Sequence, residues 1–261
     1  MPYLSKIALN PRRRIGTSLL GNPHRMHAAV LSGLAIQPVT ERVLWRLENH
    51  SVHRAELLVL TENRPSWHHL VEQAGWPDAE GGQPLVADYT PILEQVLIGR
   101  EFTFRLTANP VQSVHRPLKP SAEQAARIEQ QESIAGTTTD RRARGFRVPQ
   151  RTAAQQLNWL LTRAERHGFT IPTVPTPAPA PGITHDSPSP QDAPAVSLFT
   201  RDVLRFRKHS HGPRITLATA TFHGHLRVTD PVALRAALLA GIGPAKGYGQ
   251  GLLTLAPSQP R

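Results

Sequence analysis

The sequence of 261 residues contains no cysteine, which excludes disulfide bonds and thiolate metal sites. It also lacks any apolar run near the roughly 18 residues that a membrane-spanning helix needs, and no cleavable leader pattern follows its first basic residues. The absence of cysteine agrees with a reducing compartment. We therefore expect a soluble, cytoplasmic protein that has no membrane partner.

Acidic residues and lysine are both scarce. The 30 basic residues outnumber the 19 acidic ones and give a net charge of +11, and all but four of the basic residues are arginine. The planar guanidinium group forms paired hydrogen bonds with phosphate and stacks on bases. This charge favours nucleic acid or an anionic membrane as the partner, although an arginine-rich composition also arises from genomic base composition alone.

Glycine is concentrated near the C-terminus, where five glycines surround Lys246 between residues 241 and 251. Because glycine has no Cβ and tolerates positive φ, the backbone N–H groups of such a loop can approach a phosphate closely, and Lys246 adds a point charge. The spacing matches neither the Walker A loop nor the dinucleotide-binding fingerprint, which argues against a mononucleotide site. The pattern predicts a loop that binds a polyanion; a simple turn before the last strand is the alternative.

The order of predicted strands and helices indicates a two-domain α+β protein. Apolar periodicity in the first half predicts the ferredoxin-like order β-α-β-β-α-β, which RRM modules use for RNA. Its strands are expected at 3–9, 43–48, 55–60 and 101–107, and its helices at 26–36 and 67–74. The second half repeats the order more loosely, with helices at 151–167 and 231–240 and strands at 196–206, 215–228 and 252–255.

The chain is long enough for two small domains. We predict the first domain at 1–112, an arginine-rich connecting segment at 113–146 and the second domain at 147–261. Residues 171–194 hold eight prolines among small polar residues, which cannot bury enough apolar area to order themselves, so we expect an insertion here. The glycine-rich loop at 241–251 completes the second domain.

The candidate proton-transfer groups are His24 and His27, three residues apart at a predicted helix start. This spacing puts both rings on one face of the helix, with Arg25 nearby. An imidazole titrates near pH ~6.5 and can take or give a proton at physiological pH. Cleavage of RNA by its own 2′-hydroxyl needs only a base, an acid and cations that stabilise the phosphorane charge. The alternative is that these rings cap or pack against the helix start.

Two further histidine pairs have strand spacing, His209 with His211 and His223 with His225. A His-x-His pair can ligate zinc, but neither pair has an aspartate or glutamate at ligand spacing. Solvated strand ends or RNA contacts are therefore the favoured interpretation, and we predict no metal site. Trp45 and the other tryptophans lie in apolar stripes, which indicates core packing rather than base stacking.

Six segments, in chain order, resemble the CRISPR repeat-processing endoribonucleases of type I-E systems, the CasE family. The segments are 3–9, 22–27, 43–48, 104–110, 147–149 and 241–257. They include Asn-Pro-His-Arg-Met-His at 22–27 and the ending Gly-Ile-Gly-Pro-Ala-Lys-Gly that begins at Gly241. The matches span nearly the whole chain, and their combination is far more specific than any one of them.

The resemblance implies two tandem ferredoxin-like domains, recognition of CRISPR repeat stem-loop RNA, and cleavage at the base of the hairpin without a metal or other cofactor. It implies products with 2′,3′-cyclic phosphate and 5′-hydroxyl ends, and retention of the mature crRNA with the other subunits of Cascade. The family's catalytic histidine matches His27, whereas His24 stands where relatives carry a tyrosine. A basic catalytic residue near the scissile phosphate matches Lys208, with Arg207 as the next candidate.

A wider set of basic and glycine residues is predicted to contact RNA. These residues are Arg25, Arg141, Arg142, Arg144, Arg147, Arg205, Arg207, Gly243, Lys246, Gly247 and Gly249. Two other functions stay open at this point: a non-catalytic subunit that binds RNA hairpins, and a metal-dependent phosphodiesterase built on the His-x-His pairs. The absence of a compact carboxylate cluster argues against the second.

Overall fold

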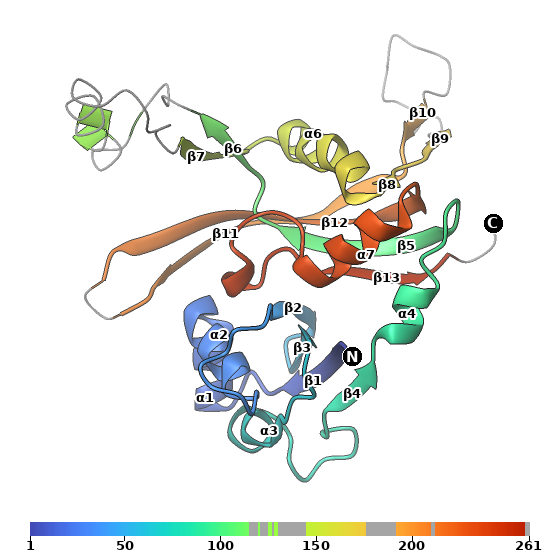
Figure 1. Ribbon diagram of the computed structural model, residues 1–261. Helices are drawn as coiled ribbons and strands as arrows, with labels where there is room; N and C mark the ends of the chain where they lie inside the picture. Colours follow the sequence, from blue (N-terminus) through green and yellow to red (C-terminus); the bar gives the residue numbers. More distant parts are fainter. Residues whose placement is uncertain are drawn as a thin grey trace, which may run out of the picture.

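The computed structural model describes residues 1–114, 145–175, 192–209 and 212–258, with residues 120, 125–126 and 128–129 between them. These residues form two α+β domains of ferredoxin-like topology, the first built on a four-stranded and the second on a five-stranded antiparallel sheet (Figure 1). The predicted fold class is confirmed. No helix in the described ranges is long and apolar enough to cross a bilayer.

The first domain has three helices on one face of its sheet. Its elements are β1 (Tyr3–Leu9), α1 (Arg14–Leu20), α2 (Pro23–Leu31), β2 (Leu44–Ser51), β3 (Arg54–Thr61), α3 (His68–Ala74) and β4 (Leu85–Asp88). The strands pair in the order β2-β3-β1-β4. Alternate strand residues such as Ile7, Leu57 and Val59 are buried with Met26 of α2 and Leu70 of α3, so the period-two pattern of the strands accounts for this core.

The second domain is assembled from segments on both sides of the undescribed residues. Its elements are β5 (Glu101–Ala108), α6 (Ala153–Ala164), η1 (Glu165–His167), β8 (Phe169–Thr170), β11 (Val196–Arg207), β12 (Arg214–Val228), α7 (Pro231–Ala240), η2 (Lys246–Tyr248) and β13 (Leu253–Pro257). The strand order is β11-β12-β5-β13, with β8 paired to β12. Phe104, Phe222, Trp159 and Leu238 lie in its core, so α6 and α7 cover this sheet.

The strand at Glu101–Ala108 corrects the predicted domain boundary. The prediction that it closes the first domain, and that this domain ends at residue 112, is wrong, because β5 pairs with β12 and β13 in the second sheet. The fourth strand of the first sheet is instead β4, which pairs with β1. The short helix α4 (Thr90–Glu94) follows β4 and precedes β5, so it connects the two domains (Figure 1).

The two segments that the sequence sets apart are described only at their ends. β6 (Val111–Val114) pairs with β7 (Phe146–Pro149) across the connecting segment. The predicted insertion at 171–194 begins and ends with β9 (Thr173–Pro175) and β10 (Asp192–Pro194), which form a two-stranded ribbon where no element is predicted. Most of both segments lies outside the described residues.

The glycine-rich loop, residues 241–251, packs against tryptophans of both domains. A Cβ added at Gly249 would come within 2.6 Å of the Trp45 ring on β2, and one added at Gly243 within 2.9 Å of the Trp159 ring on α6. Gly249 also has φ +75, a left-handed backbone conformation that favours glycine. The glycines therefore let the backbone of the second domain approach an indole of the first.

We predict that Gly249→Ala lowers the free energy of unfolding by about 2–5 kcal/mol, because it combines the strain of positive φ with overpacking against Trp45. Gly99→Ala is the matched control: Gly99 has φ +78, and an added Cβ there meets nothing within 4 Å. The control should lose only about 1–2 kcal/mol. Equilibrium urea unfolding measures both values, and equal losses would contradict a close contact between the loop and Trp45.

Candidate active site

The N-terminus of α2 is fixed by Asn22, which bonds to both domains. Its side-chain oxygen accepts from the backbone N–H groups of His24, at 2.9 Å, and Arg25, at 3.3 Å, and Pro23 fills the first helical position. These contacts are typical of a helix N-cap. The side-chain amide nitrogen of Asn22 donates to the carbonyl of Arg207 at the end of β11, at 3.2 Å. One side chain thus begins the helix and attaches it to the second domain.

His24 meets the segment that follows β11. Its ring lies edge-on to that of His209, with centroids 6.0 Å apart and an angle of 79° between the planes. Lys208 precedes His209 and is exposed. The basic segment predicted to lie near the scissile phosphate is therefore next to the helix start that carries both candidate imidazoles.

His27 is half-buried between β2 and the glycine-rich loop. The indole nitrogen of Trp45 donates to its Nδ1 at 3.3 Å. On the other side, a Cβ added at Gly247 would lie 3.3 Å from its Nε2. Burial lowers the pKa of His27 below the ordinary histidine value, and the positive charge of His24 lowers it further. The ring is therefore mostly neutral at physiological pH.

The chemistry of this arrangement follows from its charges. Two imidazoles three residues apart share the start of α2, and the basic segment at the end of β11 contacts this helix start through the carbonyl of Arg207 and the ring of His209. An anionic substrate held here would meet a proton-transfer group and positive charge together. Within the described ranges, no group of three or more histidine, aspartate or glutamate side chains is placed to hold a metal ion.

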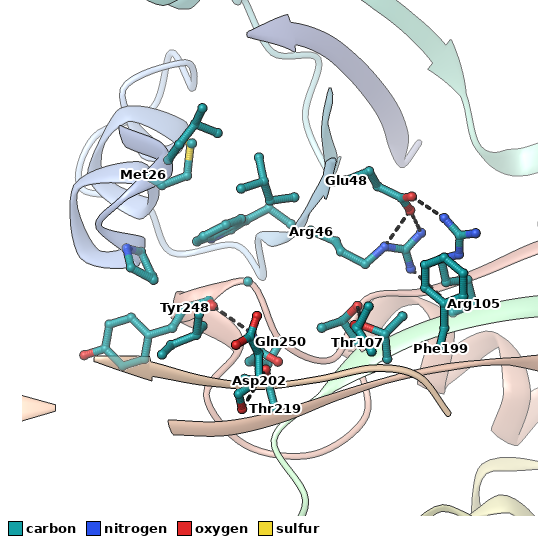
Figure 2. A pocket seen from close by; sticks show the side chains of 18 of the residues that line it. Met26, Arg46, Glu48, Arg105, Thr107, Phe199, Asp202, Thr219, Tyr248 and Gln250 are labelled. Carbon is teal, nitrogen blue, oxygen red and sulfur yellow. Dashed lines mark hydrogen bonds and ion pairs between the residues drawn. The ribbon is translucent and has the colours of Figure 1, made fainter. Parts of the chain in front are cut away.

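A cleft of about 320 Å³ lies between the domains. Figure 2 shows it with Met26 and Arg46 on the side of the first domain, and Asp202, Thr219 and Gln250 on the side of the second. Neither candidate imidazole lines this cleft, although Trp45 does. The cleft therefore adjoins the histidine site through the indole that contacts His27.

One wall of the cleft carries a buried arginine that joins the two sheets. Arg46 on β2 is only 2% exposed. It donates to the carboxylate of Glu48 on its own strand, to the carbonyls of Arg105 (2.9 Å) and Leu252 (3.0 Å), and to the hydroxyl of Thr254 (2.9 Å). Glu48 also accepts from the guanidinium of Arg105. We call these five residues the Arg46 clamp; it satisfies a buried charge with groups from both domains.

The clamp controls the ionisation of its carboxylate. Burial alone would raise the pKa of Glu48, but the charges and hydrogen bonds of Arg46 and Arg105 outweigh it, so this pKa lies below its ordinary value. Leu44, two residues before Arg46, is buried in the core of the second domain. The interface thus combines apolar packing with a paired charge.

The glycine-rich loop uses much of its backbone internally. Gly241, Ile242, Tyr248, Gly249 and Gly251 donate their backbone N–H groups to carbonyls of the chain. These five donors are not available to a phosphate. The contacts that the structure gives this loop are therefore those of domain packing, and its predicted contact with a polyanion stays a prediction.

Lys246 lies half-buried in this loop. Burial lowers its pKa first, and the nearby charge of Arg42 lowers it further. Burial also lowers the pKa of His167 at the end of η1, and the charges of Arg166, Lys246 and Arg163 lower it further. Positive groups of three segments therefore gather around the loop.

The other predicted RNA contacts are scattered. Arg25 is exposed and donates to the hydroxyl of Ser18 at 2.6 Å, and Arg205 and Arg207 are exposed on β11. Arg147 lies on β7 opposite Ser113. Arg141, Arg142 and Arg144 lie outside the described residues, as does His211. The structure therefore brings together the α2 start, the end of β11 and the loop, but leaves Arg147 elsewhere.

Sequence reasoning missed the side chains that support His27. Trp45 is buried, as predicted for a core residue, but its indole N–H bonds to the imidazole. The Arg46 clamp was also missed, although Arg46 and Glu48 are two apart on a predicted strand and so share one face. That spacing of opposite charges within an apolar strand is a detectable signal of a buried ion pair.

The fold and site together define a protein of two ferredoxin-like domains with an imidazole pair at their cationic junction. The chain belongs to the family of CRISPR associated proteins, which it matches over residues 2–257. It is 28% identical over 262 residues to the CRISPR-associated endoribonuclease Cse3 of Thermus thermophilus, an alignment that covers 98% of this chain and 100% of the relative. The predicted family resemblance is confirmed.

Solved structures of similar proteins share this two-domain fold. Thermus thermophilus Cse3 bound to an RNA representing a pre-cleavage complex is 26% identical, with a TM-score of 0.65 over 98% of this chain and 99% of that chain. Cas6e from Escherichia coli str. K-12 is 18% identical, with a TM-score of 0.51 over 98% of this chain and 100% of that chain, and shares the fold. The two-domain architecture is thus common to proteins with very different sequences.

We predict that Arg46→Met lowers the free energy of unfolding by about 3–5 kcal/mol, because it breaks a buried, fully paired charge at the interface. Arg227→Met is the matched control: it breaks the Arg227–Glu101 pair, whose side chains are 57% and 40% exposed. The control should change stability by about 0–1 kcal/mol. Urea unfolding of both variants measures the difference, and similar small losses would contradict a structural role for the clamp.

The pH dependence of the free energy of unfolding gives a second measurement of the effect of Arg46→Met. The lowered pKa of Glu48 contributes stability that is present above pH 4.5, its ordinary value, and is lost as the pH falls through the folded-state pKa. Arg46→Met removes part of this lowering, so the variant should lose less stability on acidification than the parent protein does.

Proposed function

We propose that this chain is an endoribonuclease that processes CRISPR RNA by cutting repeat hairpins. The observation that carries this proposal is the junction at the start of α2, where His24 and His27 lie beside the basic end of β11 and the glycine-rich loop. Membership of the CRISPR associated family and the likeness to RNA-bound Cse3 support it.

The proposed reaction needs no metal. The 2′-oxygen attacks the adjacent phosphorus while the bond to the 5′-oxygen breaks, which leaves 2′,3′-cyclic phosphate and 5′-hydroxyl ends. A base takes the 2′-hydroxyl proton and an acid gives one to the departing 5′-oxygen. We assign His27 as one of these groups, His24 as the group that assists or orients it, and Lys208 as the cation that stabilises the phosphorane.

We also propose that the protein keeps the mature crRNA after cleavage and carries it as a subunit of Cascade. The excess of arginine supports tight, salt-dependent binding of the RNA backbone. Retention of the crRNA and cleavage of the precursor are separate properties. The first is measured as RNA that stays bound to the protein, and the second as the chemical ends of the products.

The first experiment tests His27. His27→Ala should cut a labelled repeat hairpin about 10²–10⁴-fold more slowly, because one positioned proton-transfer group contributes about that much, while hairpin binding persists. His53→Ala is the matched control, since His53 is exposed in the turn between β2 and β3. Cleavage by His27→Ala at the rate of the control would remove His27 from the mechanism.

The same assay tests the chemistry when it is run in excess chelator beside an RNA with a 2′-deoxy sugar 5′ of the scissile phosphate. Only the all-ribose RNA should be cut. Loss of cleavage in chelator would support a metal-dependent phosphodiesterase, and binding of the hairpin without cleavage would support a non-catalytic RNA-binding subunit.

The role of His24 is tested by two substitutions. His24→Phe should lower the cleavage rate and alter its pH profile, because the ring that faces His209 is kept but the titrating nitrogens are removed. His24→Tyr supplies the phenol that the family resemblance implies at this position and should restore part of the rate lost in His24→Phe. An unchanged pH profile in His24→Phe would instead favour a packing role for this residue.

A further inference from the structure

The bond between Trp45 and His27 determines which nitrogen of the imidazole carries the proton. The indole N–H of Trp45 donates to Nδ1 of His27 at 3.3 Å. An indole nitrogen is a donor only, so Nδ1 must accept and cannot carry a hydrogen while this bond exists. In the neutral ring the hydrogen is therefore on Nε2.

The indole of Trp45 and the imidazole of His27 both pack against the glycine-rich loop. Trp45 is 3% exposed, and an added Cβ at Gly249 would approach its ring to 2.6 Å. An added Cβ at Gly247 would lie 3.3 Å from Nε2 of His27. The imidazole is thus enclosed between an indole of β2 and the backbone of the loop, with little room to turn.

We propose that Trp45 is a positioning residue for His27. The indole of Trp45 selects the form of the imidazole that carries its hydrogen on Nε2, and it directs this nitrogen toward Gly247. In this form the Nε2–H group can donate to a substrate oxygen such as the departing 5′-oxygen, but Nε2 cannot accept a proton, because the free lone pair of the neutral ring is on Nδ1 and is bonded to Trp45. Adding a second proton puts hydrogen on both nitrogens and breaks the bond to Trp45, so Trp45 favours the neutral ring. The expected effect of Trp45 on RNA cleavage rests on the proposed function, whereas its expected effect on the proton position and pKa of the His27 ring does not.

The surroundings of His27 also favour the neutral ring. Burial lowers its pKa, and His24 on the same helix lowers it further. The elements packed against α2 carry charged and titratable groups of both signs. They include Arg14 of α1, Arg46 and Glu48 of β2, His68, His69 and Glu72 of α3, Lys246 and Tyr248 of the loop, and Arg201, Asp202, Arg205, Arg207, Lys208 and His209 on or after β11. The carboxylates among these groups, Glu48, Glu72 and Asp202, do not contribute to the pKa shift of His27, which comes from burial and from His24.

The decisive variant is Trp45→Phe, which keeps most of the aromatic volume against Gly249 but removes the donor. Trp159→Phe is the matched control. Trp159 is also 3% exposed and packs against Gly243 of the same loop, but its indole N–H has no hydrogen-bond partner. A difference between the two variants therefore reports the hydrogen bond rather than the loss of an indole ring.

The measurement is the ¹⁵N chemical shifts of His27 as a function of pH in the free protein, assigned by the signals missing from His27→Gln. The parent protein and Trp159→Phe should show the form with hydrogen on Nε2. Trp45→Phe should show both neutral forms and a pKa raised by about 0.5–1 unit, because the lost hydrogen bond favoured the neutral ring. The parental form and pKa in Trp45→Phe would overturn the proposal.

Cleavage of the repeat hairpin gives the catalytic consequence. Trp45→Phe should lower kcat about 2–12-fold with KM unchanged, and the His27-dependent limb of the pH profile should move upward with the measured pKa. An unmoved limb would overturn the positioning role in catalysis. If no protein in the series cleaves RNA, the proposed function fails, while the ¹⁵N shifts still decide whether Trp45 fixes the ring.

Discussion

One buried guanidinium joins the two domains whose junction carries the candidate catalytic groups. Arg46 is almost fully removed from water, so its donors need acceptors. These come from its own strand, and in the other domain from β5, from Leu252 just before β13 and from Thr254 of β13. Guanidinium donors have a fixed planar geometry. The acceptors therefore favour one arrangement of the two sheets, and in that arrangement the glycine-rich loop reaches Trp45 and His27 on the neighbouring part of β2.

Strand geometry explains how β2 serves two purposes. Successive side chains of a strand point to opposite faces. Trp45 accordingly lies in the core beneath the helices of the first domain, whereas Leu44 lies in the core of the second. The same strand therefore joins the domains through Leu44 and Arg46 and contacts His27 through Trp45. Adjacent residues of β2 thus link the domain interface to the candidate catalytic group.

The sequence predicted local structure well and long-range pairing less well. Residues 231–240 were predicted as a helix and are α7, because proline at its start and apolar spacing are local signals. The strand at Glu101–Ala108 was also recognised, but alternation cannot tell which sheet a strand joins. β4 was missed because its mostly exposed residues lack alternation. His27 came from a motif, whereas its bond to Trp45 exists only after the chain has folded.

Asn22 limits how the helix start can vary during evolution. Aspartate, serine and threonine cap helices about as well as asparagine does. The amide of Asn22, however, uses its oxygen to accept from the N–H groups of α2 and its nitrogen to donate to the carbonyl of Arg207, whereas a carboxylate cannot donate and a hydroxyl has only one atom for both roles. An exchange to aspartate would keep the cap and lose the donor, so a substitution that is neutral for an isolated helix would not be neutral here. The identity of this one residue is constrained by two domains at once.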